Sequence, residues 1–183
     1  IGRSIMELIR HRISAINAHT NLDCAPGGVN DVLAERLGLS DIQVVNPTGV
    51  DAAGRPWGLL RRGTVEPQTM EQFLAAVKEK LDCQGMRYVN SGKPVQHVAV
   101  GGGSCAGEML DALAAGCDTF VTADVKYNQF WDAYDLGLNL IDAGHFQTEN
   151  PVVEVLAAKL REAFPDVQVC VSQNHRDCMK FFP

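Results

Sequence analysis

The chain has 183 residues, of which 46% are hydrophobic, so it is long and apolar enough to bury a core, which excludes a disordered chain. Its formal charge of −6 comes from 16 basic and 22 acidic residues without a block of like charge, which excludes a basic stripe for nucleic acid or an anionic membrane. No apolar run approaches the ~20 residues of a membrane span. We therefore expect one domain over residues 1–183, with no nucleic acid partner and no membrane segment.

Six cysteines are scattered along the chain, and no pair has the C-x-x-C spacing of a zinc knuckle or a redox motif. This usage is typical of free thiols, and no signal peptide opens the chain, so we expect a cytoplasmic protein. The opening IGRSIMELIRHRI lacks an initiator Met and resembles the middle of a helix. We therefore expect a further segment upstream of it.

The first elements are predicted to be a helix, a short strand and a second helix. Helical spacing predicts a helix over residues 2–11, and RISAINA predicts a strand that ends at His19. The polar stretch NAHTNLDCAPGGVND leaves this strand and leads to a helix over residues 31–39, which Asn30 or Asp31 is expected to cap.

The next part of the chain is rich in Pro and Gly, and two weak strands are expected there, IQVVNPT and WGLLRRGTV. The stretch PQTMEQFLAAVKEKL then predicts a helix with a defined start. Thr69 is its expected N-cap, and Gln72 follows three residues later, which is the arrangement of a capping box.

From residue 86 onward, strands and helices alternate. After a strand near residues 86–89, the expected strands are VQHVAV, TFVTA, LNLIDAG and VQVCVS. The expected helices are CAGEMLDALAAG, YNQFWDAYDLG and NPVVEVLAAKLREAF. Such alternation implies βα units and a mixed, largely parallel sheet covered by helices, so the predicted fold class is α/β.

Polar residues gather where three of these strands end, at residues 19–23, 101–104 and 145–149. Ligands of open α/β sheets collect at the carboxyl ends of the strands. In GHFQTEN, the His145 imidazole and the Glu149 carboxylate are four residues apart, so a helical turn would point both to one side. Nitrogen with oxygen is a ligand set for transition metals.

Each cluster also has a purely structural interpretation. Thr148 or Asn150 would cap the helix that Pro151 begins, with Glu149 favoured by the positive end of the helix dipole. Asp23 would be a capping residue of its loop, and His19 a half-buried histidine. Spacing alone leaves both alternatives open.

The stretch VAVGGGSCA is a weaker candidate. Gly101, Gly103 and Ala106 satisfy G-x-G-x-x-G/A, and Asp124 follows 23 residues after Gly101. The amides of this loop would cradle a phosphate, although a tight packing turn is favoured over a dinucleotide site. Cys105 at the start of the helix is a poor candidate nucleophile, because no base is evident near it.

Two motifs of this chain, H-T-N-x-D in HTNLD and G-H-x-x-T-E in GHFQTE, are specific in combination. With the intervening GGGSCAGEMLDALAAGCDTFVTADVKYNQFWDAYDLGLNLIDAGHFQTE, they resemble the Nif-three-like family of dinuclear metal-centre proteins, whose members are named GTP cyclohydrolase I type 2 homologues. The resemblance runs from about the first residue to the C-terminus.

The resemblance implies two intertwined α/β lobes, assembled into a toroidal hexamer, with two divalent ions in a cleft of each subunit. By motif, Asp23, His145 and Glu149 resemble the metal ligands, and Glu149 the bridge between the ions. Zinc, iron and manganese all suit such ligands. The residues that would lie around the ligands or face a substrate are His19, Thr20, Asn21 and Thr148.

The chain departs from the family pattern in two places. The family carries a His-His pair upstream of the first motif, and this chain begins after that point. We therefore expect an N-terminal segment to be lacking and the ions to have an incomplete ligand set here, with low occupancy. Many relatives also carry a His near Asn128.

The resulting hypothesis is a metal-dependent hydrolase or cyclohydrolase with metal-bound water as nucleophile, acting on a nucleotide or another small molecule. The alternative is a ring-forming interaction or regulatory protein with a structural metal. A third hypothesis is a nucleotide-binding module that uses Gly101 to Ser104 without metal.

Overall fold

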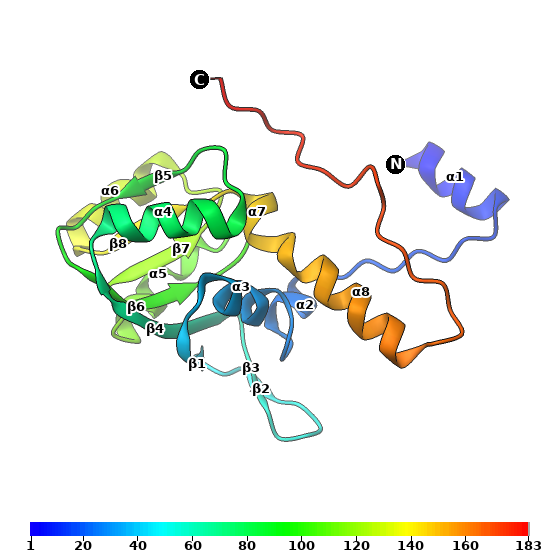
Figure 1. Cartoon of the computed structure of the whole chain (residues 1–183), viewed down its shortest axis with the longest axis horizontal. Coiled ribbons are helices and arrows are strands. Elements are labelled where there is room, and N and C mark those ends of the chain that lie inside the picture. The colour runs from blue at the N-terminus through cyan, green and yellow to red at the C-terminus, as the bar shows by residue number, and fades with distance from the viewer. Residues whose placement is uncertain (183) are drawn as a thin grey trace.

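A computed structural model describes residues 1–182, and it has a mixed α/β architecture built on one six-stranded sheet (Figure 1). The strand order is β1 (Ser40–Val45), β4 (Leu60–Gln68), β6 (Val95–Val100), β7 (Thr119–Thr122), β8 (Asn139–Asp142) and β5 (Arg87–Val89). Strands β6, β7 and β8 are parallel, with Val98 opposite Thr119, and the outer pairings are antiparallel. The predicted fold class is confirmed, with parallel pairing confined to the centre.

The helices are α1 (Gly2–Arg10), α2 (Thr20–Cys24), α3 (Val29–Leu37), α4 (Met70–Leu81), α5 (Met109–Ala114), α6 (Tyr127–Leu136), α7 (His145–Glu149) and α8 (Pro151–Ala163). A 3-10 turn over Ala106–Glu108 precedes α5, and β2 (Gly49–Val50) and β3 (Pro56–Trp57) form a projecting hairpin (Figure 1). No helix of the described residues is both long and apolar enough to cross a membrane.

The sheet is buried on both faces by helices. Helices α3 and α4 pack on one face, where Phe73 and Val77 meet Val98 of β6. Helices α5 and α6 pack on the other face, where Met109 and Ala133 share a cluster with Phe120. Successive residues of a strand point to opposite faces, and because helices cover both faces, every residue of β7 and β8 is buried.

Local sequence signals account for the ends of two helices. Thr69 accepts a hydrogen bond from the backbone of Gln72, whose side chain accepts one from the backbone of Thr69, so the predicted capping box is confirmed. Gly38 ends α3 with φ of 82°, a conformation that glycine adopts without steric cost. The predicted cap of α3 is wrong, because the N-cap is Gly28 and Asn30 lies inside the helix.

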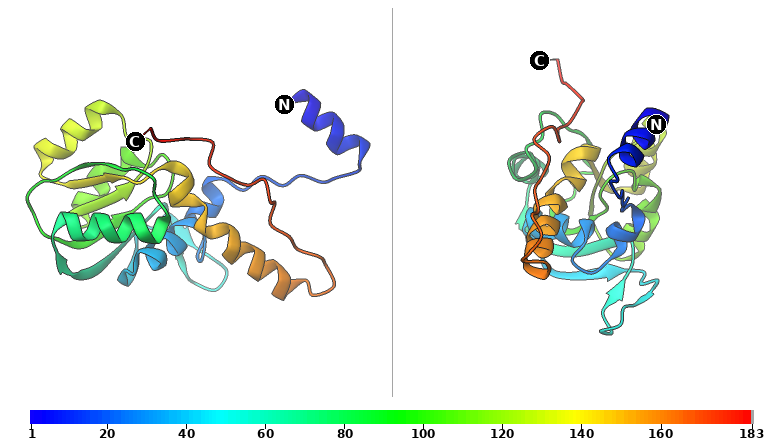
Figure 2. Two further views of the ribbon diagram at one scale, coloured as in Figure 1. Left: turned by 45° about the horizontal axis from the view of Figure 1, so that its top comes forward. Right: turned by 90° about the vertical axis from the view of Figure 1, so that its right-hand side faces the viewer.

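Two stretches predicted as strands, RISAINA and VQVCVS, are extended but form no strand. Hydrogen bonds to a neighbouring strand hold a strand in place, and neither stretch is paired within residues 1–182. Both run beside α8, where Ile16 and Val169 line one groove. Helix α1 buries no side chain and lies away from the sheet (Figure 2).

A buried arginine joins the loop after α2 to the sheet. The Arg61 side chain is 1% exposed, forms an ion pair with Asp31, and donates to the carbonyl oxygens of Gly58 (2.7 Å) and Cys24 (3.2 Å). A buried charge costs several kcal/mol to desolvate, so it is tolerated only where such partners surround it. Arg61 therefore fixes the position of the loop that carries the first motif.

We expect Arg61→Met to lower the free energy of unfolding by about 3 kcal/mol, because it leaves Asp31 and the loop carbonyls without their partner. Urea denaturation followed by circular dichroism measures this. The matched control is Arg55→Met, since Arg55 pairs with Asp51 but is 64% exposed. An equal shift of the urea midpoint in both variants would contradict a special role for Arg61.

Candidate metal centre

The candidate site lies where the parallel strands end. The glycine loop 101–103 follows β6, Asp124 follows β7, and His145 follows β8. Because the carboxyl ends of parallel strands meet at one edge of a sheet, residues far apart in sequence become neighbours there. The loop and the short helix α7 thus lie side by side.

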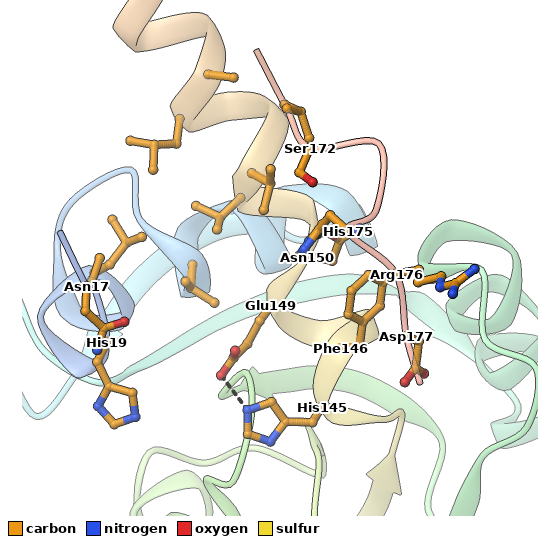
Figure 3. A pocket seen from close by; sticks show the side chains of 18 of the residues that line it. Asn17, His19, His145, Phe146, Glu149, Asn150, Ser172, His175, Arg176 and Asp177 are labelled. Carbon is orange, nitrogen blue, oxygen red and sulfur yellow. Dashed lines mark hydrogen bonds and ion pairs between the residues drawn. The ribbon is translucent and has the colours of Figure 1, made fainter. Parts of the chain in front are cut away.

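His145 and Glu149 face each other across one turn of α7. His145 Nε2 lies 3.1 Å from Glu149 Oε1, as the dashed line in Figure 3 shows. The side chains are 46% and 38% exposed, so they remain accessible from solvent. The prediction that a helical turn points both to one side is confirmed.

The other ring nitrogen of His145 is also engaged. Nδ1 lies 2.7 Å from Asp124 Oδ2, so the imidazole sits between two carboxylates. Burial lowers the pKa of His145, but the hydrogen bond that His145 donates to Asp124 and the charges of Glu149 and Asp124 together outweigh it and raise the pKa.

Asp23 belongs to the same site although it comes from α2. Burial raises the pKa of its carboxyl group, and the negative charge of Glu149 raises it further, while His19 and His145 oppose this. Asp23 and His19 line the same groove as His145 and Glu149. The structure therefore brings the first and second motifs to one place.

The remaining residues predicted around the ligands make local contacts. Thr20 is exposed and its hydroxyl lies 3.0 Å from His19 Nδ1, and Asn21 accepts a hydrogen bond from the His19 backbone (2.8 Å). Neither lines the groove. Thr148 is buried and accepts a hydrogen bond from Gly103 N (2.9 Å), so it joins α7 to the glycine loop.

The groove has a volume of about 910 Å³. Its polar end carries Asp23, His145 and Glu149, and Figure 3 shows His19 across from Glu149. Its apolar wall is formed by Ile16, Ala18, Val152, Val153, Leu156, Leu160, Val169 and Val171. Further polar residues line the groove where the C-terminal segment passes it, namely Asn150, Ser172, His175, Arg176 and Asp177.

The glycine loop packs against this site and does not bind through its amides. Gly102 N donates to Asn30 Oδ1 (2.6 Å), and Gly103 N donates to Thr148 Oγ1. Both amides are occupied, which favours the packing turn over a phosphate cradle. Burial raises the pKa of the neighbouring Cys105 thiol to about 12, which agrees with the expectation that Cys105 is a poor nucleophile.

Gly103 is required because a side chain there would enter the site. A Cβ on Gly103 would lie 2.2 Å from Glu149 Oε1 and 3.2 Å from His145 Nε2, and its φ is 63°. The absent side chain leaves room beside these two donor atoms. Close approach of backbone to a site is one of the uses of glycine.

The carboxylates of Asp23 and Glu149 and the imidazole of His145 are groups that bind divalent cations. The distance between His145 and Glu149 also suits a shared cation. Atoms 3.1 Å apart are close enough to share an ion at bond lengths of about 2.0 to 2.2 Å, as His145 and Glu149 would. Within residues 1–182, however, no group of three or more His, Cys, Asp or Glu side chains has already converged on one point. An ion held by all three side chains would require Asp23 to lie closer to this pair than it does here.

The sequence interpretation missed two residues of the site. Asp124 was considered only as part of a dinucleotide signature, and Asn30 only as a cap. The signal that points to Asp124 is its position two residues after the end of β7, at the edge of the sheet where His145 follows β8. The Asn30 side chain is fully buried and makes three hydrogen bonds, to Asp23, Leu59 and Gly102. No local pattern in the sequence predicts these partners.

Comparison with known proteins supports the motif assignment. Residues 1–178 match the model of the family described as Duf34/NIF3 (NGG1p interacting factor 3). A Clostridium perfringens protein named GTP cyclohydrolase 1 type 2 homolog is 32% identical over 186 residues, covering 99% of this chain and 69% of that protein. A Streptococcus pneumoniae protein of the same name is 33% identical, covering 86% of this chain and 59% of that protein.

A solved structure shares the fold. The crystal structure of a Staphylococcus aureus hypothetical protein has a TM-score of 0.87 and 29% identity, covering 99% of this chain and 73% of that one. The chain thus spans 59 to 69% of the length of the two named relatives, so activities of the whole proteins come to it only as proposals.

We expect Gly103→Ala to lower the free energy of unfolding by roughly 1–3 kcal/mol, because the new methyl group displaces Glu149 and His145 and strains the backbone. Gly107→Ala is the matched control, since a Cβ there meets no atom within 4 Å and needs no positive φ. Thermal and urea unfolding compare the two. Equal stability of both variants would contradict the close contact.

Proposed function

Because the chain belongs to the DUF34/NIF3 family, we propose that it binds divalent metal through Asp23, His145 and Glu149 and serves a metal-dependent hydrolase or cyclohydrolase reaction. The observation that carries this proposal is the single groove that all three side chains line, although α2 and α7 lie more than a hundred residues apart in sequence. Zinc, iron and manganese suit these donors.

Each ligand has a distinct structural support. Glu149 and His145 are held on one turn of α7, which Thr148 fastens to the glycine loop through Gly103. Asp23 is held through its backbone, because the Asn30 side chain donates a hydrogen bond to its backbone oxygen (3.3 Å). When bound, a pair of divalent ions lowers the pKa of water and so supplies hydroxide for hydrolysis at neutral pH.

The substrate we propose is a small molecule, with a nucleotide as the first candidate. The relatives named after GTP cyclohydrolase suggest this class, and the groove of about 910 Å³ has the size of small-molecule sites. His19 and Asn17, which line the groove near its polar end, offer hydrogen-bonding groups to such a molecule. The cytoplasm remains the expected location.

The alternative function is assembly, with a structural metal and a homo-oligomer, a hexamer in our expectation. The family description itself refers to an interacting factor. In the structure, Ile13, Ile16 and Val167 are large apolar residues that are more than half exposed on the extended segments. Exposed apolar surface of this kind is typical of interaction sites.

The first test is metal content per chain by elemental mass spectrometry, with zinc, iron and manganese measured together. We expect low but measurable metal occupancy in the unmodified chain and loss of most of that metal in Asp23→Asn and His145→Ala, because each removes a donor from the shared groove. His97→Ala is the control, since His97 is an exposed histidine of β6. Unchanged metal content in both ligand variants would contradict the proposal.

Chelation then separates the two functions. If the metal is catalytic, a chelator abolishes turnover of the tested nucleotides with little change in melting temperature. If the metal is structural, the chelator lowers the melting temperature or dissociates the oligomer. Size-exclusion chromatography with light scattering measures the second outcome.

A further inference from the structure

Asp124 contacts the candidate site from the side opposite the groove ligands. Its Oδ2 lies 2.7 Å from His145 Nδ1, and it is 48% exposed. The second ring nitrogen, Nε2, faces Glu149. The two nitrogens of an imidazole point in divergent directions, so Asp124 and Glu149 lie across the ring from each other.

The backbone around Asp124 is fixed on both sides. Ala123 N donates to Gly103 O (2.9 Å), and Val125 N donates to Asp142 Oδ2 (3.1 Å). Asp124 itself has φ of 52°, a conformation that residues other than glycine adopt rarely. Hydrogen bonds to its neighbours therefore hold this residue in the conformation that aims its carboxylate at His145.

One buried carboxylate sets the distance between Asp124 and His145. Asp142 at the end of β8 accepts from Val125 N through one oxygen and from Gly144 N through the other (3.2 Å), and it pairs with Arg87. It thereby joins the residue after Asp124 to the residue before His145. The backbone positions from which the two side chains meet are thus fixed by the fold.

We propose that Asp124 is a positioning residue that orients His145, so that Nδ1–H is donated to Asp124 and Nε2 is the atom presented to a divalent cation. This inference rests on the proposed function. Metal-bound histidines almost always donate their other ring N–H to a carboxylate, a carbonyl or water, and loss of that partner typically costs 10–100-fold in metal affinity. Asp124 supplies such a carboxylate to His145 and is not itself one of the three proposed ligands.

The test compares zinc affinity of the full chain and three variants by competition with a chromogenic chelator. Asp124→Gly removes the carboxylate while suiting the left-handed backbone, so the fold is retained. Asp124→Asn keeps an acceptor for Nδ1–H. We expect roughly 10–100-fold weaker zinc binding for Asp124→Gly, a smaller loss for Asp124→Asn, and no change for Asp132→Ala, an exposed acid of α6.

A second measurement reads the orientation directly. Nitrogen-15 NMR of the zinc-loaded chain reports which ring nitrogen of His145 carries the proton, and we expect Nδ1–H in the unmodified chain and loss of that fixed state in Asp124→Gly. His145→Ala serves as the reference for the proposed function and is expected to abolish tight binding.

The outcomes separate the two claims. Wild-type zinc affinity in Asp124→Gly, together with loss of binding in His145→Ala, overturns the role of Asp124 and leaves the proposed function in place. A changed number of zinc ions in Asp124→Gly makes Asp124 a ligand, which also overturns it. Absence of binding by the unmodified chain, or full binding by His145→Ala, overturns the proposed function, and the role of Asp124 falls with it.

Discussion

The candidate site depends on the hydrogen bonds of the Asn30 side chain. This side chain is fully buried and donates to the backbone oxygens of Asp23 and Leu59 (2.6 Å), while it accepts from Gly102 N. It therefore joins the loop of the first motif, the start of β4 and the glycine loop after β6. A buried amide without these partners would cost several kcal/mol, so the three segments stabilise one another only in this arrangement.

From Asn30, the constraint continues to the second motif through the glycine loop. Gly102 is bound by Asn30 and Gly103 by Thr148, so two successive amides connect α3 to α7. Because Gly103 has no side chain, Glu149 approaches the loop closely. A chain of hydrogen bonds thus links the positions of Asp23 and Glu149, which are far apart in the sequence.

Local signals predicted the parts of this fold that depend on neighbours in sequence. The capping box of Thr69 and Gln72 is such a case, since all its atoms lie within four residues. Asn30 shows the limit: its residue type suggests a cap, but its partners are distant in sequence and tertiary contacts decide its role. Asp124 was missed for the same reason, because its contact with His145 exists only once β7 and β8 pair. The motif resemblance identified the groove residues, which periodicity could not place together.

The arrangement of charge around His145 gives the strongest physical reason for a cation at this site. When the neutral ring donates Nδ1–H to Asp124, the lone pair of Nε2 and the carboxylate of Glu149 face each other 3.1 Å apart. That contact is attractive only if a proton or a cation lies between them. Asp23 adds a further negative charge to the same groove, and the charge of Glu149 already opposes its ionisation. A divalent ion between Nε2 and these carboxylates would relieve both repulsions at once, whereas a proton on Nε2 relieves the first and only part of the second.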